Sequence, residues 1–196
     1  MGDGSTLRTG LKEWSTVCRS LERGRQIFLL RKGGIYESAG EFEVEHRRFV
    51  LFPTYVHQKR EMLKPEVHGD FEPRAAEPER VELRCWCEVS DIVEVRSRER
   101  VDALGAEHVW TPPLIVMRFN YRPENPLYLL VVRTFLLHEP VTIENTIAYA
   151  GCKSWVPLER AVDVSDSRAA LPHDDFARRR GRVLETLACA SKAGAR

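Results

Sequence analysis

The chain has 196 residues, of which 43% are hydrophobic and 30% are charged, and its formal net charge is +1. This composition excludes a disordered chain, and the near-zero charge gives no general case for nucleic-acid binding beyond a local basic face. The longest apolar stretch, Leu127–Leu137, is interrupted by Arg133 and is far shorter than the roughly 20 residues of a membrane span. Five cysteines without a paired spacing suit a reducing compartment, so we expect a soluble, cytoplasmic protein.

The first third of the chain predicts two helices and two buried strands. Apolar residues recur at helical spacing from about Lys12 to Arg23, and Gly24 then offers a left-handed C-terminal cap. Gln26–Arg31 and Phe49–Phe52 are continuously apolar, which is typical of strands buried on both faces. Thr54–Leu63 is predicted to be a short helix with Thr54 as its N-cap.

The remainder predicts alternating strands and helices after a loop. Prolines and charges at residues 64–80 predict a charged loop. Apolar residues then alternate from Val81 to Arg96, which indicates a strand with one wet face. Further strands are predicted at Leu114–Phe119 and Leu127–Leu137, joined as a hairpin, and at Trp155–Leu158; further helices are predicted at Arg98–Leu104 and Asp174–Ala190.

This order of elements predicts an α+β fold. We expect a small, curved, mostly antiparallel sheet flanked by an N-terminal and a C-terminal helix. Residues 1–165 would form a single α+β domain that includes the charged loop at 64–80, and residues 166–196 would form the C-terminal helix.

Common catalytic motifs are absent from the sequence. It contains no P-loop, dinucleotide-binding glycine pattern, nucleophile elbow or zincin motif, so the usual nucleotide-binding and hydrolase folds are not expected. Cys85 and Cys87 are two residues apart on one strand and lack a second cysteine or histidine pair, which favours reduced core thiols over a zinc site.

A dense polar cluster between Arg31 and Gln58 is the candidate site. Carboxylates and imidazoles that converge at a strand end could hold a metal ion or perform acid–base chemistry, and Glu45, His46 and His57 are placed for this. Thr54, His57 and Gln58 would share one helical face. Alternatively, the glutamates are solvated and the histidines serve as caps or packing.

Two cations follow the first buried strand. Arg31 and Lys32 precede the double glycine at 33–34, where a charged side chain beside an exposed turn can bind a phosphate or carboxylate. Their alternative interpretation is an ordinary charged loop. The arginines at 178–180 and 182 could contact a phosphate backbone or simply form a solvated helix face.

Several short motifs carry a family resemblance. Glu13-Trp14, LLRKGGI at 29–35, Glu45-His46, Phe49, LFPT at 51–54, His57-Gln58 and Trp155-Val156 resemble a bacterial family known as domain of unknown function 1802. The resemblance covers about residues 11–160. The family implies no established activity, but its association with restriction-type nuclease domains in the same polypeptides implies a role in nucleic-acid recognition or processing.

The opening of the chain is also similar to PUA-like barrels, including the ASCH and EVE groups. A helix that ends in a Leu-x-x-Gly pattern, followed by a strand that ends in a basic residue, carries this similarity over Trp14–Arg31. The similarity implies a barrel-like sheet and binding of RNA or modified bases.

Three functions remain open from the sequence. The leading hypothesis is a nucleic-acid- or nucleotide-binding module in which Arg31 and Lys32 contact phosphate, whereas Thr54, His57 and Gln58 contact a base or sugar. Second is a metal-dependent hydrolase or nuclease that uses Glu45, His46 and His57. A third is a protein-interaction domain whose polar cluster is only structural. The leading hypothesis requires neither a cofactor nor a metal.

Overall fold

The computed structural model describes residues 5–32, 35–38, 41–44, 46–151 and 153–193, with side chains described outside 35–44 and 190–193. Its strands are β1 (Thr6–Trp14), β2 (Phe28–Arg31), β3 (Ile35–Ser38), β4 (Glu41–Val44), β5 (Arg48–Thr54), β6 (Arg80–Val95), β7 (Leu127–Glu144), β8 (Trp155–Asp163) and β9 (Arg168–Ala169). Its α-helices are α1 (Ser15–Glu22), α2 (Arg98–Asp102), α3 (Pro112–Asn120) and α4 (His173–Ala193). Short 3₁₀ turns are η1 (Arg60–Met62), η2 (Pro65–Asp70), η3 (Gly105–Glu107) and η4 (Ile147–Tyr149).

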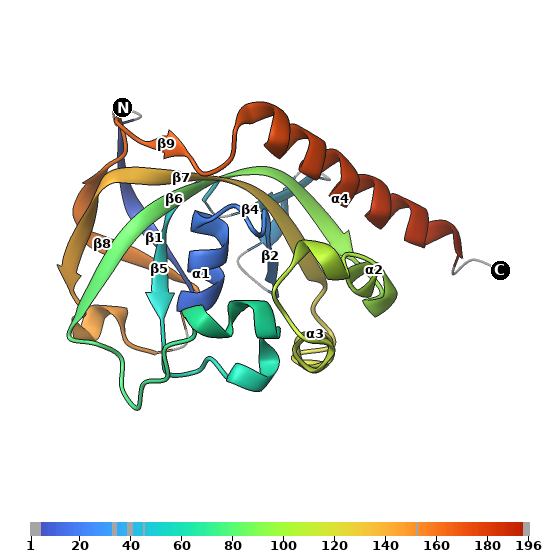
Figure 1. Ribbon diagram of the computed structural model, residues 1–196, viewed down its shortest axis with the longest axis horizontal. Coiled ribbons are helices and arrows are strands. Elements are labelled where there is room, and N and C mark those ends of the chain that lie inside the picture. Colours follow the sequence, from blue (N-terminus) through green and yellow to red (C-terminus); the bar gives the residue numbers. More distant parts are fainter. Residues whose placement is uncertain (1–4, 33–34, 39–40, 45, 152, 194–196) are drawn as a thin grey trace.

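A strongly curved, seven-stranded sheet organises the molecule (Figure 1). The strand order is β2-β7-β6-β5-β1-β8, with β9 added on β7, and within the described residues β1 and β5 are the only strands that pair in parallel. Strands β3 and β4 form a separate hairpin. The predicted α+β class and mostly antiparallel, curved sheet are confirmed.

The sheet does not close into the barrel that the PUA-like similarity implied. Strands β2 and β8 are the two ends of the hydrogen-bonded order. The short strand β2 is connected to β1 by a side-chain hydrogen bond, in which the guanidinium of Arg31 donates to the backbone carbonyl of Lys12 at 2.9 Å. The curvature therefore brings two strand ends together without backbone pairing between them.

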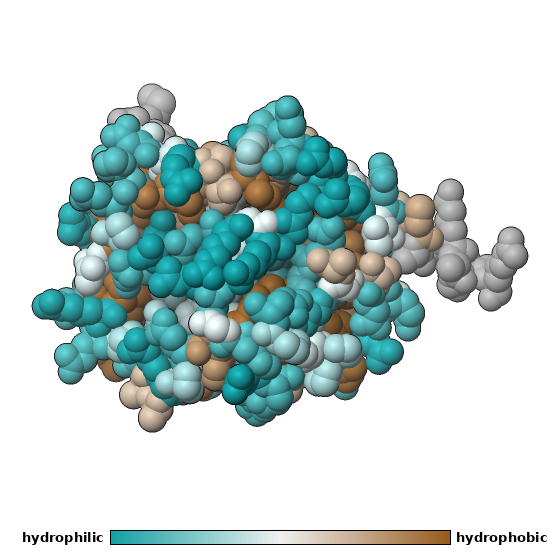
Figure 2. All heavy atoms as spheres, viewed as in Figure 1, coloured by the Kyte–Doolittle hydropathy of each residue, from teal (hydrophilic) through white to brown (hydrophobic). Residues whose placement is uncertain are grey.

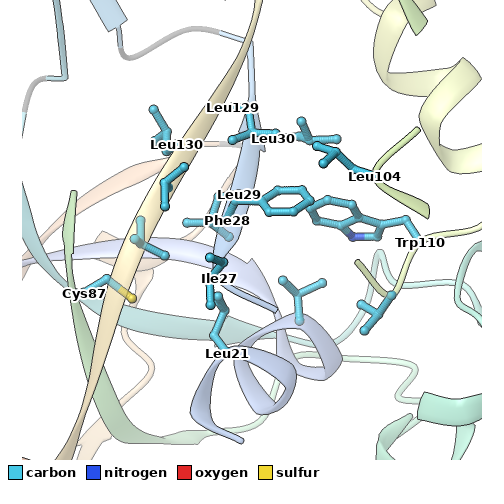
Figure 3. Close-up of a cluster of buried hydrophobic side chains, with 14 of the residues drawn as sticks. Leu21, Ile27, Phe28, Leu29, Leu30, Cys87, Leu104, Trp110, Leu129 and Leu130 are labelled. Carbon is cyan, nitrogen blue, oxygen red and sulfur yellow. The ribbon is translucent and has the colours of Figure 1, made fainter. Parts of the chain in front are cut away.

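Two hydrophobic cores lie on opposite faces of the curved sheet. In the larger core, side chains from α1, β2, β6, β7 and the segment around Trp110 converge, with the Phe28 and Trp110 rings 5.9 Å apart (Figure 3). The smaller core lies between β5, β6, β7 and β8 and contains Phe52 and Tyr149. On the face shown in Figure 2, hydrophilic side chains cover most of the surface and hydrophobic residues are visible only between them.

An irregularity in β6 divides its residues between these cores. The sequence predicted one apolar face from Val81 through Val89, but the register shifts between Leu83 and Cys85. As a result Val81 and Leu83 lie in the smaller core, and Cys85 and Cys87 lie in the larger one. Both thiols are free, and burial raises the pKa of Cys85 well above its usual value and that of Cys87 to about 12, so both stay protonated.

The predicted first helix begins three residues too early. Lys12–Trp14 belong to β1 because their backbone pairs with Phe52–Thr54 of β5, and α1 begins at Ser15. The apolar stripe of α1 is buried as predicted, and Gly24 has φ of +64°, the left-handed conformation expected of a C-terminal cap.

Two other predicted elements are wrong. Leu114–Phe119 lies in helix α3 and not in a strand, since Pro112 occupies the first helical turn and the adjacent Leu114 and Ile115 are both buried. The helix predicted at Thr54–Leu63 is absent. Strand β5 continues to Thr54, whose hydroxyl donates to the Glu13 carbonyl at 3.1 Å and caps no helix.

The remaining predicted elements are present with shifted ends. The strands that contain 28–31, 49–52, 81–95, 127–137 and 155–158, and the helices near 98–102 and 173–190, are all observed. The predicted loop begins with η2, whose Val67 is fully buried, and is irregular only from residue 71 to 79. None of the helices in the described ranges has the length and apolar character required to cross a membrane.

Candidate functional site

A cleft of about 610 Å³ opens where the carboxyl ends of β1 and β5 lie side by side. The parallel pairing of these strands places Trp14 opposite Thr54. Residues from α3, η4 and the irregular segment before β6 complete the walls. Phe52 and Tyr149, whose ring centroids are 5.2 Å apart, separate the cleft from the smaller core. Its volume lies within the usual range of small-molecule sites.

A buried ion pair between Arg31 and Glu13 lies at the base of the cleft. Arg31 Nη2 donates to Glu13 Oε2 at 2.9 Å, and the two residues are only 8% and 4% exposed. The other carboxylate oxygen of Glu13 accepts the Trp14 N–H at 2.8 Å. Arg31 Nε is also buried, and it has no hydrogen-bond partner among the described residues.

Three further cationic side chains, Lys12, Arg118 and Lys153, line the cleft. Arg118 from α3 is half-buried and Lys153 is exposed, and neither forms a hydrogen bond or ion pair with the residues that the structure describes. Lys12 Nζ donates to the carbonyls of Tyr149 and Gly151, which ties β1 to the η4 segment. Burial lowers the pKa of Arg31, Glu13 opposes this shift, and the nearby positive charge of Arg118 lowers the pKa further.

Acidic side chains are also present at one wall. Glu77 and Glu79, from the segment before β6, both line the cleft. The Glu77 carboxylate accepts hydrogen bonds from backbone N–H groups that follow β5, whereas Glu79 is exposed to solvent. Among the described residues, the cleft therefore combines four cationic side chains with two carboxylates that are bound internally, Glu13 and Glu77, and one that is exposed, Glu79.

Of the sequence-predicted site residues, three line the cleft. These are Arg31, Thr54 and His57. The hydroxyl of Thr54 donates to the Glu13 carbonyl and keeps its lone pairs available as acceptors. The imidazole of His57 is exposed at the end of the turn that follows β5.

Gln58 lies beside the cleft in a structural position. Its Oε1 accepts from the Ser15 and Thr16 hydroxyls and, at 3.4 Å, from the Thr16 N–H, so it caps the first turn of α1. Its Nε2 donates to Ser15 Oγ and to the Glu72 carbonyl, each at 3.0 Å. Because both amide atoms are engaged, Gln58 has no hydrogen-bonding group left to read a base.

Lys32 and His46 have other neighbours. Lys32 Nζ donates to the carbonyls of Phe119 at 2.7 Å and Arg122 at 3.2 Å, at the C-terminal end of α3. His46 packs edge-on against Trp155, with ring centroids 5.3 Å apart. Glu45 lies outside the described residues. Among the residues that are described, no group of three or more metal-ligating side chains is placed to hold an ion.

The arginines of α4 are engaged in ion pairs. Arg180 binds Asp91 of β6, and both Arg179 and Arg182 bind Glu107 of η3. These contacts attach α4 to the rest of the fold, so this helix face differs from the freely solvated one expected from sequence.

The sequence-based prediction missed several residues of the cleft. Lys12 and Glu13 were assigned to a helix, and Arg118 was assigned to a strand, so neither prediction pointed toward the site. The family motif Glu13-Trp14 was the feature of the sequence that marked this part of the chain. If residues 12–14 had been predicted as a strand, the alternation of side chains would have placed Glu13 on the opposite face from Lys12 and Trp14.

No curated protein matches the chain. Two similar solved structures are crystal structures of mutant ZmASCH proteins from Zymomonas mobilis. The first is 11% identical, covering 78% of this chain and 90% of that chain with a TM-score of 0.46, and the second is 10% identical, covering 88% and 94% with a TM-score of 0.42.

A family model described as a domain of unknown function, DUF1802, matches residues 10–182. The resemblance seen in the short motifs is thereby confirmed, and the match extends beyond residue 160 into α4. The chain belongs to the DUF1802 family.

Proposed function

We propose that the cleft at the ends of β1 and β5 binds a nucleotide unit, either free or within a single-stranded nucleic acid. The observation that carries the proposal is that two arginines, the buried Arg31 and the half-buried Arg118, line one cleft from different elements, and that Arg118 has no ion-pair partner among the described residues. A phosphate bound beside both would form charge-assisted hydrogen bonds.

The walls of the cleft suit the remainder of a nucleotide. Ile147 is 89% exposed at the rim, where it offers an apolar contact to a base, and the aromatic wall is formed by Phe52 and Tyr149. Thr54 and His57 supply polar groups for a sugar or a base edge. Lys32 and Gln58, which the sequence placed among the ligand contacts, instead support α3 and α1 in this proposal.

The test is equilibrium binding of fluorescently labelled single-stranded RNA and DNA, measured as a function of salt. Contacts from Arg118 and Lys153 would neutralise about two phosphates, because the charge of Arg31 is already paired with Glu13, so the slope of log affinity against log salt should be about −1.4 at roughly 0.7 per phosphate. Arg118→Ala should make this slope shallower by about 0.7.

Arg160→Ala is the matched control, since Arg160 is exposed on β8 and does not line the cleft. It should leave the slope unchanged, and the thermal stability of both variants should match that of the parent protein. Absence of binding at about 50 mM salt and micromolar protein, or equal effects of the two substitutions, would reject the proposal.

A further inference from the structure

The segment from Glu72 to Glu79 forms a strap whose last three residues, Glu77, Pro78 and Glu79, line the cleft. It is the green loop between η2 and the start of β6 in Figure 1. One end is held by Gln58, whose Nε2 donates to the Glu72 carbonyl. The other end is held by Asn145, whose side chain donates to the Pro78 carbonyl at 2.9 Å and whose backbone N–H donates to the Glu79 carbonyl at 2.7 Å.

Between these two attachments the strap has few contacts. Residues 73–76 are exposed, and the Arg74 guanidinium lies 4.7 Å from the centre of the Tyr55 ring. Moving the middle of the strap would therefore expose little apolar surface. Its main polar contact is the carboxylate of Glu77.

Glu77 binds two consecutive backbone amides. The Tyr55 N–H lies 3.0 Å from both carboxylate oxygens, and the Val56 N–H lies 3.0 Å from Oε1. These amides follow the last residue of β5, where the chain leaves the sheet, and so they have no strand partner. Successive backbone N–H groups directed at one point form a common binding arrangement for anions.

The carboxylate of Glu77 and one of its two donor residues, Val56, lie on the wall of the cleft, whereas Tyr55 lines a separate small pocket. Thr54, Val56, His57 and Glu77 all line it, together with the cations described above. Glu77 thus places a negative charge where an anionic ligand of the cleft would find two oriented donors.

We propose that the Tyr55 and Val56 amides are a second anion subsite of the cleft, which binds a phosphate group and is occupied in this structure by the chain's own Glu77. The nature of the ligand as a nucleotide rests on the proposed function, whereas the subsite itself requires only phosphate chemistry. An entering phosphate displaces the carboxylate into solvent, and the strap moves away from the cleft with it. Glu77 is therefore an internal competitor that weakens ligand binding.

The test is a titration with inorganic phosphate at constant ionic strength, followed by the ¹⁵N–¹H signals of Tyr55 and Val56. In Glu77→Ala, phosphate should shift both signals with an apparent affinity on the order of tenfold higher than in the parent protein, because the competing carboxylate is gone. Glu79→Ala is the matched control. It removes a carboxylate from the same strap and cleft but frees no amide, so it should behave like the parent protein.

Glu77→Gln provides a second variant in case the alanine disturbs the turn, because its amide retains one neutral acceptor for the backbone donors. It should also bind phosphate more tightly than the parent protein. If neither Glu77 variant gains affinity at these two amides, or if Glu79→Ala gains as much, Glu77 only fixes the turn and the inference is overturned.

The two proposals fail separately. If the cleft does not bind nucleic acid, the oligonucleotide assay is negative but the phosphate shifts at Tyr55 and Val56 persist in the Glu77 variants. If the amides are not an anion subsite, these shifts are absent, whereas the effect of Arg118→Ala on oligonucleotide binding is unchanged.

Discussion

Replacing Arg31 by methionine should destabilise the protein by about 3–5 kcal/mol, because it breaks a buried ion pair and leaves one charge without its partner. The guanidinium lies 2.9 Å from the Glu13 carboxylate and is shielded from solvent, and Glu13 would keep only its hydrogen bond to the Trp14 N–H. The sequence alone suggested exposed cations here, for which a loss below about 1 kcal/mol would be expected.

Urea unfolding at neutral pH measures this difference as a shift in midpoint at constant slope. The double variant Arg31→Met with Glu13→Leu should recover much of the loss, since apolar residues of similar size often replace a buried pair at little cost. Lys153→Met, at the exposed rim of the same cleft, should change stability by about 0.5 kcal/mol or less. A loss below about 1 kcal/mol for Arg31→Met would show that water reaches the pair and would refute this reasoning.

Two further predictions concern the attachment of helices. Removal of residues 166–196 should lower the midpoint of urea unfolding strongly and expose apolar surface to a hydrophobic dye, because Val183 and Leu187 of α4 are buried in the larger core. An unchanged midpoint would show that residues 1–165 fold independently of the helix. Lys32→Met should remove a cation from the C-terminal end of α3, so that hydrogen exchange of the α3 amides accelerates while the global free energy of unfolding changes by about 1 kcal/mol or less. Unaltered exchange would contradict this capping role.

The helices and strands that could be predicted from the sequence are those whose burial shows in the local pattern of apolar residues. Strands β2 and β5 were recognisable because they are buried on both faces and therefore continuously apolar, and α4 was recognisable from its apolar face. The apolar run at 114–119 was ambiguous, since such a short run fits a buried strand or a buried helix equally well. Pro112 was the feature that favoured the helix.

The candidate site depended on contacts that no local pattern contains. Arg31 meets Glu13 only because the sheet curves until β2 approaches β1, and Arg118 reaches the cleft only because its segment is a helix. Glu77 belongs to a stretch that looked like an ordinary charged loop, and its role depends on two amides about twenty residues earlier. The sequence thus identified the region around Arg31, Thr54 and His57 but not the residues that share the cleft with them.

The buried imidazole of His108 should make the fold sensitive to mild acid. His108 is 6% exposed, its Nδ1 accepts the Trp110 N–H at 3.2 Å, and its Nε2 is buried with no partner at hydrogen-bond distance among the described residues. Burial, with a smaller contribution from the charge of Lys64, lowers its pKa from 6.5 to about 4, although the backbone of Val101 and the charge of Asp102 act in the opposite direction.

Between these two pH values His108 is protonated in the unfolded chain but neutral in the folded chain. Its contribution to the free energy of unfolding is therefore fully present above about pH 6.5 and is lost as the pH decreases toward 4. The contribution reaches about 3 kcal/mol at 1.36 kcal/mol per pKa unit. His108→Asn keeps an acceptor for the Trp110 N–H but cannot titrate. Urea unfolding from pH 7 to pH 4.5 should therefore show a steeper loss of stability in the parent protein than in this variant, while acidic residues elsewhere affect both alike. Parallel pH profiles for the two proteins would mean that the folded state accommodates the charged imidazole, which its burial beside the Phe28 and Trp110 rings argues against.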